Sequence, residues 1–312
     1  MARSSLVSVG LLGLSLSLTS GLTPPIASAQ VAQPVKPSAA PAKNPKPNPQ
    51  TNPQFQDVQE RLSRIDAAAN SKDIQALMSF YSQEFTNSDG LTRQSLQKAI
   101  AQLWQEYPAL TYRTELLEIL PSRSKGIEIE TITYATAKTE IQGRPTDLSF
   151  MVKSRQRWEE DKLIQQTVLS EQNRVSFGDQ PPTILVRLPD SVKVGQKYTY
   201  EAIMQEPIAP DDYILGDILE ETISPATHLS TAKIQFEVPS IAEILNDRIA
   251  EPATSSPPSA TLRRFRLRKL RTGGFFKIAQ APKRADDQWL SVVLVRPSGG
   301  MTLISQRLQV TN

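Results

Sequence analysis

The sequence predicts an α+β domain, with three helices on a curved antiparallel sheet, followed by an all-β sandwich. Three observations predict this order: apolar residues at helical spacing over 55–108, alternating residues over 112–172, and about seven short strands after the proline pair at 181. The length of 312 residues suits about two domains, and 39% hydrophobic with 21% charged residues is typical of a soluble globular protein.

Composition excludes several kinds of chemistry. The chain has 24 prolines and no cysteine, which excludes disulfides, thiolate metal sites and cysteine nucleophiles. The single histidine, His228, argues against a zinc centre or a serine-histidine triad and is expected on the surface or in a loop. No P-loop or glycine-rich dinucleotide motif is present. We therefore expect no metal and no cofactor.

The N-terminus has the pattern of a secretory signal. Arg3 precedes a Leu-rich run, and Ala27-Ser28-Ala29 forms an A-x-A cleavage site, so residues 1–29 are expected to be removed. The apolar run is too short and too rich in serine for a membrane anchor, so we expect no membrane span after cleavage. The predicted location of the mature protein is the periplasm or the extracellular space.

Residues 30–54 are rich in proline and contain no acid and no aromatic residue, which predicts a disordered, extended linker. A proline-rich ligand for a partner domain is the alternative. Arg3 and the three linker lysines account for four of the 35 basic residues, so 31 basic and 32 acidic residues remain in the folded part. The near-neutral body and the formal charge of +3 indicate no nucleic-acid partner.

Three amphipathic helices are expected first. Val58, Leu62, Ile65 and Ala69 form one stripe. A second stripe follows from Ile74 through Phe85. For the third helix, Thr92 is the expected N-cap, Leu91 the staple, and Pro108 the stop.

An antiparallel meander follows, in which apolar residues alternate over 112–120, 148–158 and 162–172. In 127–138 the apolar phase shifts between Ile129 and Ile132, which predicts a bulge that bends the sheet. The helices are then expected to close over the concave face.

Residues 183–312 predict an immunoglobulin-like sandwich, because short alternating strands are separated by turns. It lacks the Cys, Trp, Cys framework of true immunoglobulin domains. One inserted helix is expected at 240–250, since Ser240 and Glu243 form a capping box.

The string DIQALMSFYSQEFTNSDG (73–90), the capped helix after it and the hairpin RWEEDKLIQQ (157–166) resemble the nuclear transport factor 2-like superfamily. This superfamily includes SnoaL-type cyclases, ketosteroid isomerases and many non-catalytic members. The resemblance covers residues 55–178. It implies an α+β cone and allows a homodimer through the cone sheet, but it implies no single function because the fold hosts unrelated chemistries.

The isomerase branch implies one candidate catalytic residue. An ungapped comparison from Asp73 places Asp89 on the general base of ketosteroid isomerases. The same comparison places Ile65 and Ser154 where those enzymes have a tyrosine and a protonated acid as oxyanion donors, so two of the three roles are unfilled. The alternative for Asp89 is a turn former in an Asp-Gly turn.

Five aromatic residues are candidates for an apolar ligand pocket under the helices: Tyr81, Trp104, Tyr112, Tyr134 and Trp158. Core packing is the alternative for each of them, since aromatic residues at helical or strand spacing usually fill volume.

The segment 261–272 has six basic residues in twelve. On a strand, Arg264, Arg266 and Arg268 share one face, which makes them candidates for an anion-binding surface. The favoured interpretation is that they pair with the acids of 211–221 or protect a sheet edge, because basic and acidic residues nearly balance in this part of the chain.

These features together predict an exported, non-catalytic binding or assembly module of the cell envelope, whose partner is a protein or a small apolar ligand. The first alternative is a cofactor-free isomerase, cyclase or dehydratase of the SnoaL type that uses Asp89. The second is an adaptor that binds anionic polymers through the Arg-rich strand 262–271.

Overall fold

The computed structural model of the protein describes residues 5–9, 53–121, 126–141, 143–209, 212–223, 234–238, 262–265 and 267–312. Most of the predicted signal peptide and linker, the predicted helix at 240–250, and His228 lie outside these residues. The described helices are α1 (Pro53–Asn70), α2 (Ile74–Ser79) and α3 (Arg93–Glu106). None of them combines the length and apolar composition that a bilayer span requires.

Local sequence accounts for how these helices begin. The Asp73 side chain accepts from the backbone N–H groups of Gln75 and Ala76 at the start of α2. Thr92 is the N-cap of α3 and forms a capping box with Ser95, which confirms Thr92 as the predicted cap. The second stripe does not stay helical to Phe85, because α2 ends at Ser79 and the chain continues as strand β2 (Tyr81–Asn87), which pairs with β6.

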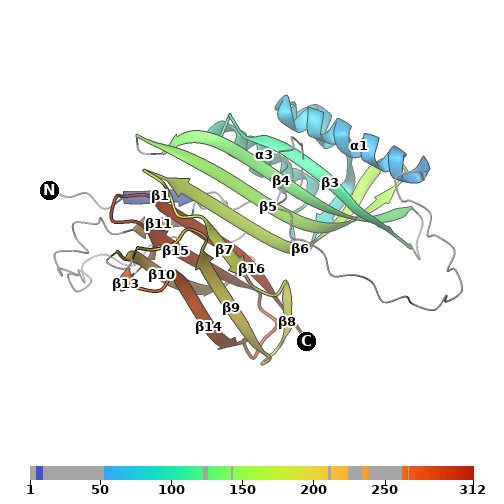
Figure 1. Ribbon diagram of the computed structural model, residues 1–312. Helices are drawn as coiled ribbons and strands as arrows, with labels where there is room; N and C mark the ends of the chain where they lie inside the picture. The colour runs from blue at the N-terminus through green and yellow to red at the C-terminus, as the bar shows by residue number, and fades with distance from the viewer. Residues whose placement is uncertain are drawn as a thin grey trace, which may run out of the picture.

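A ten-stranded sheet is the centre of the molecule (Figure 1). Its main path runs in the order β13-β10-β15-β16-β6-β5-β4-β3; β2 pairs with β6, and β8 pairs with β16. The strand bounds are β3 (Thr111–Leu120), β4 (Ile127–Ile141), β5 (Arg144–Glu159), β6 (Lys162–Phe177), β8 (Ser191–Lys193), β10 (Ile214–Thr222), β13 (Arg268–Leu270), β15 (Gln288–Val295) and β16 (Met301–Thr311).

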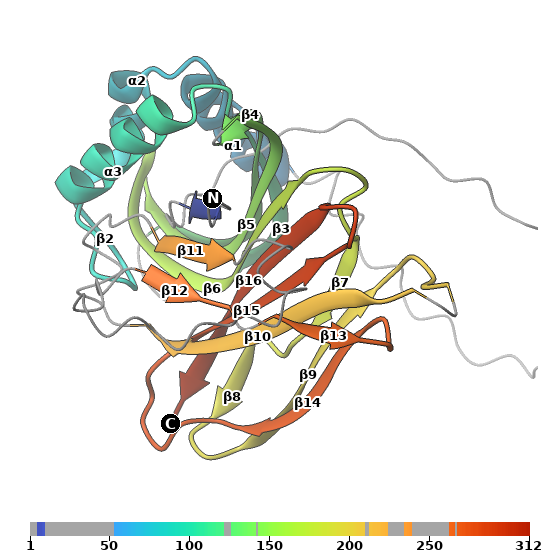
Figure 2. The same cartoon turned by 90° about the vertical axis from the view of Figure 1, so that its left-hand side faces the viewer.

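Two smaller sheets are also present among the described residues. The first has the order β14-β9-β7, with β7 at Ile184–Arg187, β9 at Lys197–Met204 and β14 at Gly274–Gln280. The second joins β11 (Ile234–Val238) to β1 (Ser5–Val9) and β12 (Leu262–Arg264). Figure 2 shows β4, β5 and β6 curving beneath α2 and α3, with β9 and β14 on the far side of β15 and β16.

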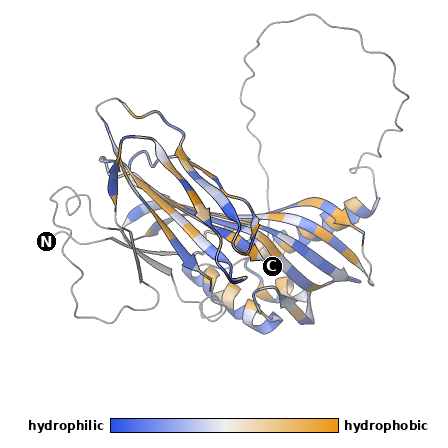
Figure 3. Cartoon of the chain, turned by 90° about the horizontal axis from the view of Figure 1, so that it is seen from below, coloured by the Kyte–Doolittle hydropathy of each residue, from blue (hydrophilic) through white to orange (hydrophobic). Residues whose placement is uncertain are grey.

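The large sheet packs on both faces. Its helix-facing side is buried with α1, α2 and α3 in a core that continues to Trp289, Val293 and Leu303 on β15 and β16. The opposite side is called the outer face here. It contributes Leu290, Val292 and Ile304 to a second core, which it forms with the β14-β9-β7 sheet. The sheets carry both hydrophobic and hydrophilic residues (Figure 3). Buried and more exposed positions alternate along β4 and β5, whereas every residue of β15 is buried, as expected for a strand that is covered on both faces.

The predicted fold class, an α+β cone followed by an immunoglobulin-like sandwich, is wrong. The described residues are mostly antiparallel sheet, and one sheet of ten strands runs through both predicted parts. The link is the pairing of β16 with β6, from Met301 opposite Phe177 to Gln306 opposite Gln172. The last strand of the chain therefore extends the sheet that begins in the N-terminal half. A pairing between strands so distant in sequence leaves no mark on local periodicity.

The predicted bulge also lies elsewhere. Along β4 the odd positions are buried without interruption from Ile129 to Ala137, so the strand keeps one phase. The apparent shift arose because its inward positions 131 and 133 are threonines, both fully buried. In the pairing of β3 with β4, the register shifts on β3, between Leu116 and Glu118, and the pairing of β5 with β6 contains two further shifts.

Candidate functional site

Asp89, the candidate catalytic residue, is held by Arg307 of β16. The Arg307 guanidinium donates from Nη2 to Asp89 Oδ1 at 2.7 Å and from Nη1 to Asp89 Oδ2 at 3.1 Å. Both side chains are 6% exposed. This two-bond pairing is the strongest geometry available to a carboxylate and an arginine. It connects the turn before α3 to the last strand of the chain.

Two further carboxylates surround the same guanidinium, and we call these four residues the Arg307 cluster. Asp287 Oδ2 accepts from Nε at 2.9 Å and from Nη2 at 2.7 Å, and Glu171 Oε2 lies 3.9 Å from Nη1. Burial lowers the pKa of Arg307, but the hydrogen bond and charge of Asp89, with the charges of Glu171 and Asp287, outweigh it, so that the pKa is raised overall. Arg307 therefore stays charged.

The backbone at Asp89 is fixed by a turn. Asn87 Oδ1 accepts from Asp89 N at 3.0 Å and from Leu91 N at 2.8 Å, and Gly90 has a φ of 82°. Asp89 is thus a turn residue whose two carboxylate oxygens face a guanidinium. A proton accepted by this carboxylate would break the pairing with Arg307.

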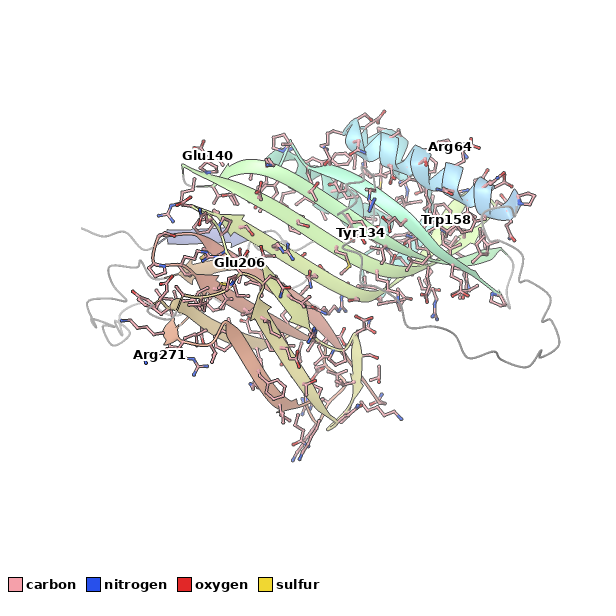
Figure 4. All side chains as sticks on the ribbon, viewed as in Figure 1. Arg64, Tyr134, Glu140, Trp158, Glu206 and Arg271 are labelled. Carbon is pink, nitrogen blue, oxygen red and sulfur yellow. The ribbon has the colours of Figure 1, made fainter. Side chains whose placement is uncertain are left out.

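Four of the five aromatic candidates are buried in the core beneath the helices, and the fifth, Tyr134, lies on the outer face. Trp104 Nε1 donates to the Tyr112 hydroxyl at 2.6 Å, and both side chains are buried. The Tyr81 ring packs edge-on against Phe85 with centroids 5.0 Å apart. Trp158 lies near the end of β5, below α1 (Figure 4). Tyr134, on an even position of β4, is on the outer face, where the Arg113 guanidinium lies 4.9 Å from its ring centroid.

A buried polar network on the helix-facing side was not predicted. Trp158 Nε1 donates to Gln156 Oε1 at 3.1 Å, and Gln156 Nε2 donates to Thr131 Oγ1 at 3.1 Å. Gln166 Nε2 donates to Ser154 Oγ at 3.2 Å, and the Thr131 and Ser154 hydroxyls are 3.2 Å apart. Ser154, which stands at the acid position of the isomerase comparison, therefore joins two glutamines. Polar residues at inward positions of otherwise apolar strands are the sequence signal for this network.

Ile65, which stands at the tyrosine position of the same comparison, is buried in α1. The next residue, Asp66, is also buried and accepts from Thr114 N at 3.3 Å and Thr114 Oγ1 at 3.2 Å. This carboxylate thus fastens α1 to β3. Asp66 stands four residues after Leu62 and three before Ala69, so its spacing places it at the edge of the buried stripe. The spacing does not indicate which strand it contacts.

The Arg-rich segment forms two short strands, β12 and β13. Arg268 is exposed on β13, and its guanidinium lies 5.5 Å from the Phe275 ring centroid. Arg266 and the Arg264 side chain lie outside the described residues. Because β13 pairs with β10, Arg268 stands beside the strand that contains Asp217 and Glu220. No group of three or more histidine, cysteine, aspartate or glutamate side chains in the described ranges has metal-site geometry.

Comparisons with known proteins give the chain a family model only in its C-terminal part. The model of a domain of unknown function (DUF8623) matches residues 179–242 and 241–311. No curated protein has a matching sequence.

Solved structures with cystatin-like and ketosteroid isomerase-like folds match about 35% of the chain. A cystatin-fold protein from Novosphingobium aromaticivorans is 16% identical over 35% of this chain and 94% of its own, with a TM-score of 0.28. ActVI-ORFA from Streptomyces coelicolor is 11% identical over 37% and 92%, with a TM-score of 0.29. A ketosteroid isomerase-like protein from Erwinia carotovora atroseptica is 13% identical over 38% and 98%, with a TM-score of 0.24.

Proposed function

We propose that this protein is an exported, non-catalytic binding or assembly module of the cell envelope. The observation that carries the proposal is the pairing of Asp89 with Arg307 in a buried cluster, since both oxygens of the candidate base contact the guanidinium. The oxyanion donors of the isomerase comparison are also missing: Ile65 has no polar group, and Ser154 is joined to Gln166 inside the buried network.

An exposed apolar strip on the β14-β9-β7 sheet supports a binding role. Leu185, Ile203, Phe276 and Ile278 are the large exposed residues of its outward side, and Phe276 and Ile278 are each 64% exposed. Exposed apolar residues gathered on one sheet face are typical of interaction surfaces. Export is proposed from the signal pattern of residues 1–29 alone.

Steroid turnover tests the proposal. The purified protein is expected not to isomerise Δ5-3-ketosteroids above the buffer rate, because loss of even one oxyanion donor typically costs about two to three orders of magnitude in rate. Two variants are compared with the wild-type protein: Asp89→Asn removes the candidate base, and Arg307→Gln removes the guanidinium that contacts it. Turnover that Asp89→Asn abolishes while the protein stays folded would favour the enzyme alternative and reject the proposal.

Export is tested separately. Intact-mass measurement of the exported protein is expected to show a chain that begins at Gln30, since cleavage after Ala29 is predicted. A chain that retains Met1 in a membrane fraction would contradict this part of the proposal and leave the comparison of enzyme and binding module unaffected.

A further inference from the structure

A groove of about 500 Å³ lies on the outer face of the large sheet, where β4, β5 and β6 meet the segment that leads into β7. Pro181, Pro182 and Thr183 form one wall, and strand residues form the floor. The volume is within the range of small-ligand sites, about 300–1,000 Å³. The groove is separate from the Arg307 cluster, because Arg307 is on the helix-facing side of the same sheet.

Strand register lines the floor with polar side chains in two rows. The first row crosses four adjacent strands through Thr111, Thr136, Ser149 and Arg174, each the register partner of the next. The second row runs through Lys138, Asp147 and Ser176. All seven residues line the groove. Hydroxyl groups from neighbouring strands therefore lie side by side, and the first row ends at the guanidinium of Arg174.

Arg174 has no acidic partner in the described part of the chain, although its side chain is half-buried. Other arginines of the outer face are paired: Arg155 lies 2.8 Å from Glu130, and Arg157 lies 3.6 Å from Glu159. The one carboxylate in the groove, Asp147, is 3.8 Å from Lys138, and both of these side chains are mostly exposed. A partly desolvated guanidinium without a carboxylate is suited to an external oxyanion.

We propose that this groove binds a small hydroxylated ligand that carries a carboxylate or a phosphate, such as a sugar acid or a sugar phosphate. The Arg174 fork binds the oxyanion, and Ser149, Thr136 and Ser176 exchange hydrogen bonds with the hydroxyl groups of the ligand. This binding site goes beyond the proposed function, which does not depend on it.

Calorimetric titration of the purified protein with glucuronate and with glucose 6-phosphate tests the proposal, and uncharged methyl glucoside is the control ligand. A Kd of about 1 mM or lower is expected for at least one of the two anions, and the tighter one identifies the oxyanion. Arg174→Gln is expected to weaken that anion by about tenfold or more, because hydrogen bonds to charged groups are the strong ones. Ser149→Ala is expected to weaken it by about two- to fivefold.

Arg155→Gln is the matched control, since it removes the same charge from the same face of the sheet outside the groove lining. It is expected to change the Kd by less than about twofold. Thermal unfolding of each variant checks that it is folded. The proposal is overturned if neither anion binds, if methyl glucoside binds as tightly as the anions, or if Arg155→Gln weakens binding as much as Arg174→Gln does.

Discussion

The Arg307 cluster makes a quantitative prediction about stability. Arg307→Gln leaves the carboxylates of Asp89, Glu171 and Asp287 without their cation, and Glu171 is fully buried. Removing one partner of a buried pair typically costs about 3–5 kcal/mol, because the remaining charge stays desolvated. Asp89→Asn keeps the shape of the side chain but removes its negative charge from the two-bond contact with Arg307. The free energy of unfolding is therefore expected to fall by about 1.5–3 kcal/mol.

A double-mutant cycle isolates the interaction between Asp89 and Arg307. Its coupling free energy is expected to be about 1.5–3 kcal/mol, measured as the change in the free energy of unfolding in urea. The exposed pair of Arg187 and Glu201, 3.0 Å apart with the arginine 64% exposed, is the control, for which about 0–1 kcal/mol is expected. If the buried pair couples no more strongly than the exposed pair, the structural role assigned to Asp89 is refuted.

Three further predictions concern other parts of the molecule. Burial raises the pKa of Tyr198 to about 12 and raises the pKa of Tyr81, Tyr112 and Tyr200 further, above the unfolded value of about 10. Their contribution to stability is therefore complete below pH 10 and is lost as the pH rises through the folded values. Of the seven tyrosines of the chain, these four should add their tyrosinate absorbance only together with the loss of circular dichroism, and absorbance of all seven before unfolding would contradict this. Gly178→Ala should lower the free energy of unfolding in urea more than Gly195→Ala does. Both glycines have positive φ, but an added Cβ at 178 would lie 2.5 Å from the Gly299 carbonyl oxygen, whereas at 195 it meets nothing within 4 Å. Equal losses of unfolding free energy would disprove the close contact at 178. Replacing both Phe276 and Ile278 by serine should change the free energy of unfolding by less than about 1 kcal/mol, because both are exposed, and a large loss would mean that the exposed apolar strip serves folding.

The sequence by itself determined the local structure of much of the chain. Thr92 and its capping box, the stripe of α1 and the strand alternation of β5 are all visible in the spacing of residues, because a cap, a helix face and a strand face depend on neighbours a few positions away. Asp89 in an Asp-Gly turn was also recognisable, since the turn is made by Asn87 to Leu91.

Only the tertiary structure decided how these elements combine. Arg307 lies 218 residues from Asp89, and nothing in the spacing of either residue indicates the other. The pairing of β16 with β6 brings them together and joins two predicted units into one sheet. The hydroxyl rows beside Arg174 arise in the same way, from the register of β3, β4, β5 and β6. Periodicity records which face of an element is buried, but the free energy of burial does not depend on which distant segment covers that face, so the partner is fixed only when the chain folds.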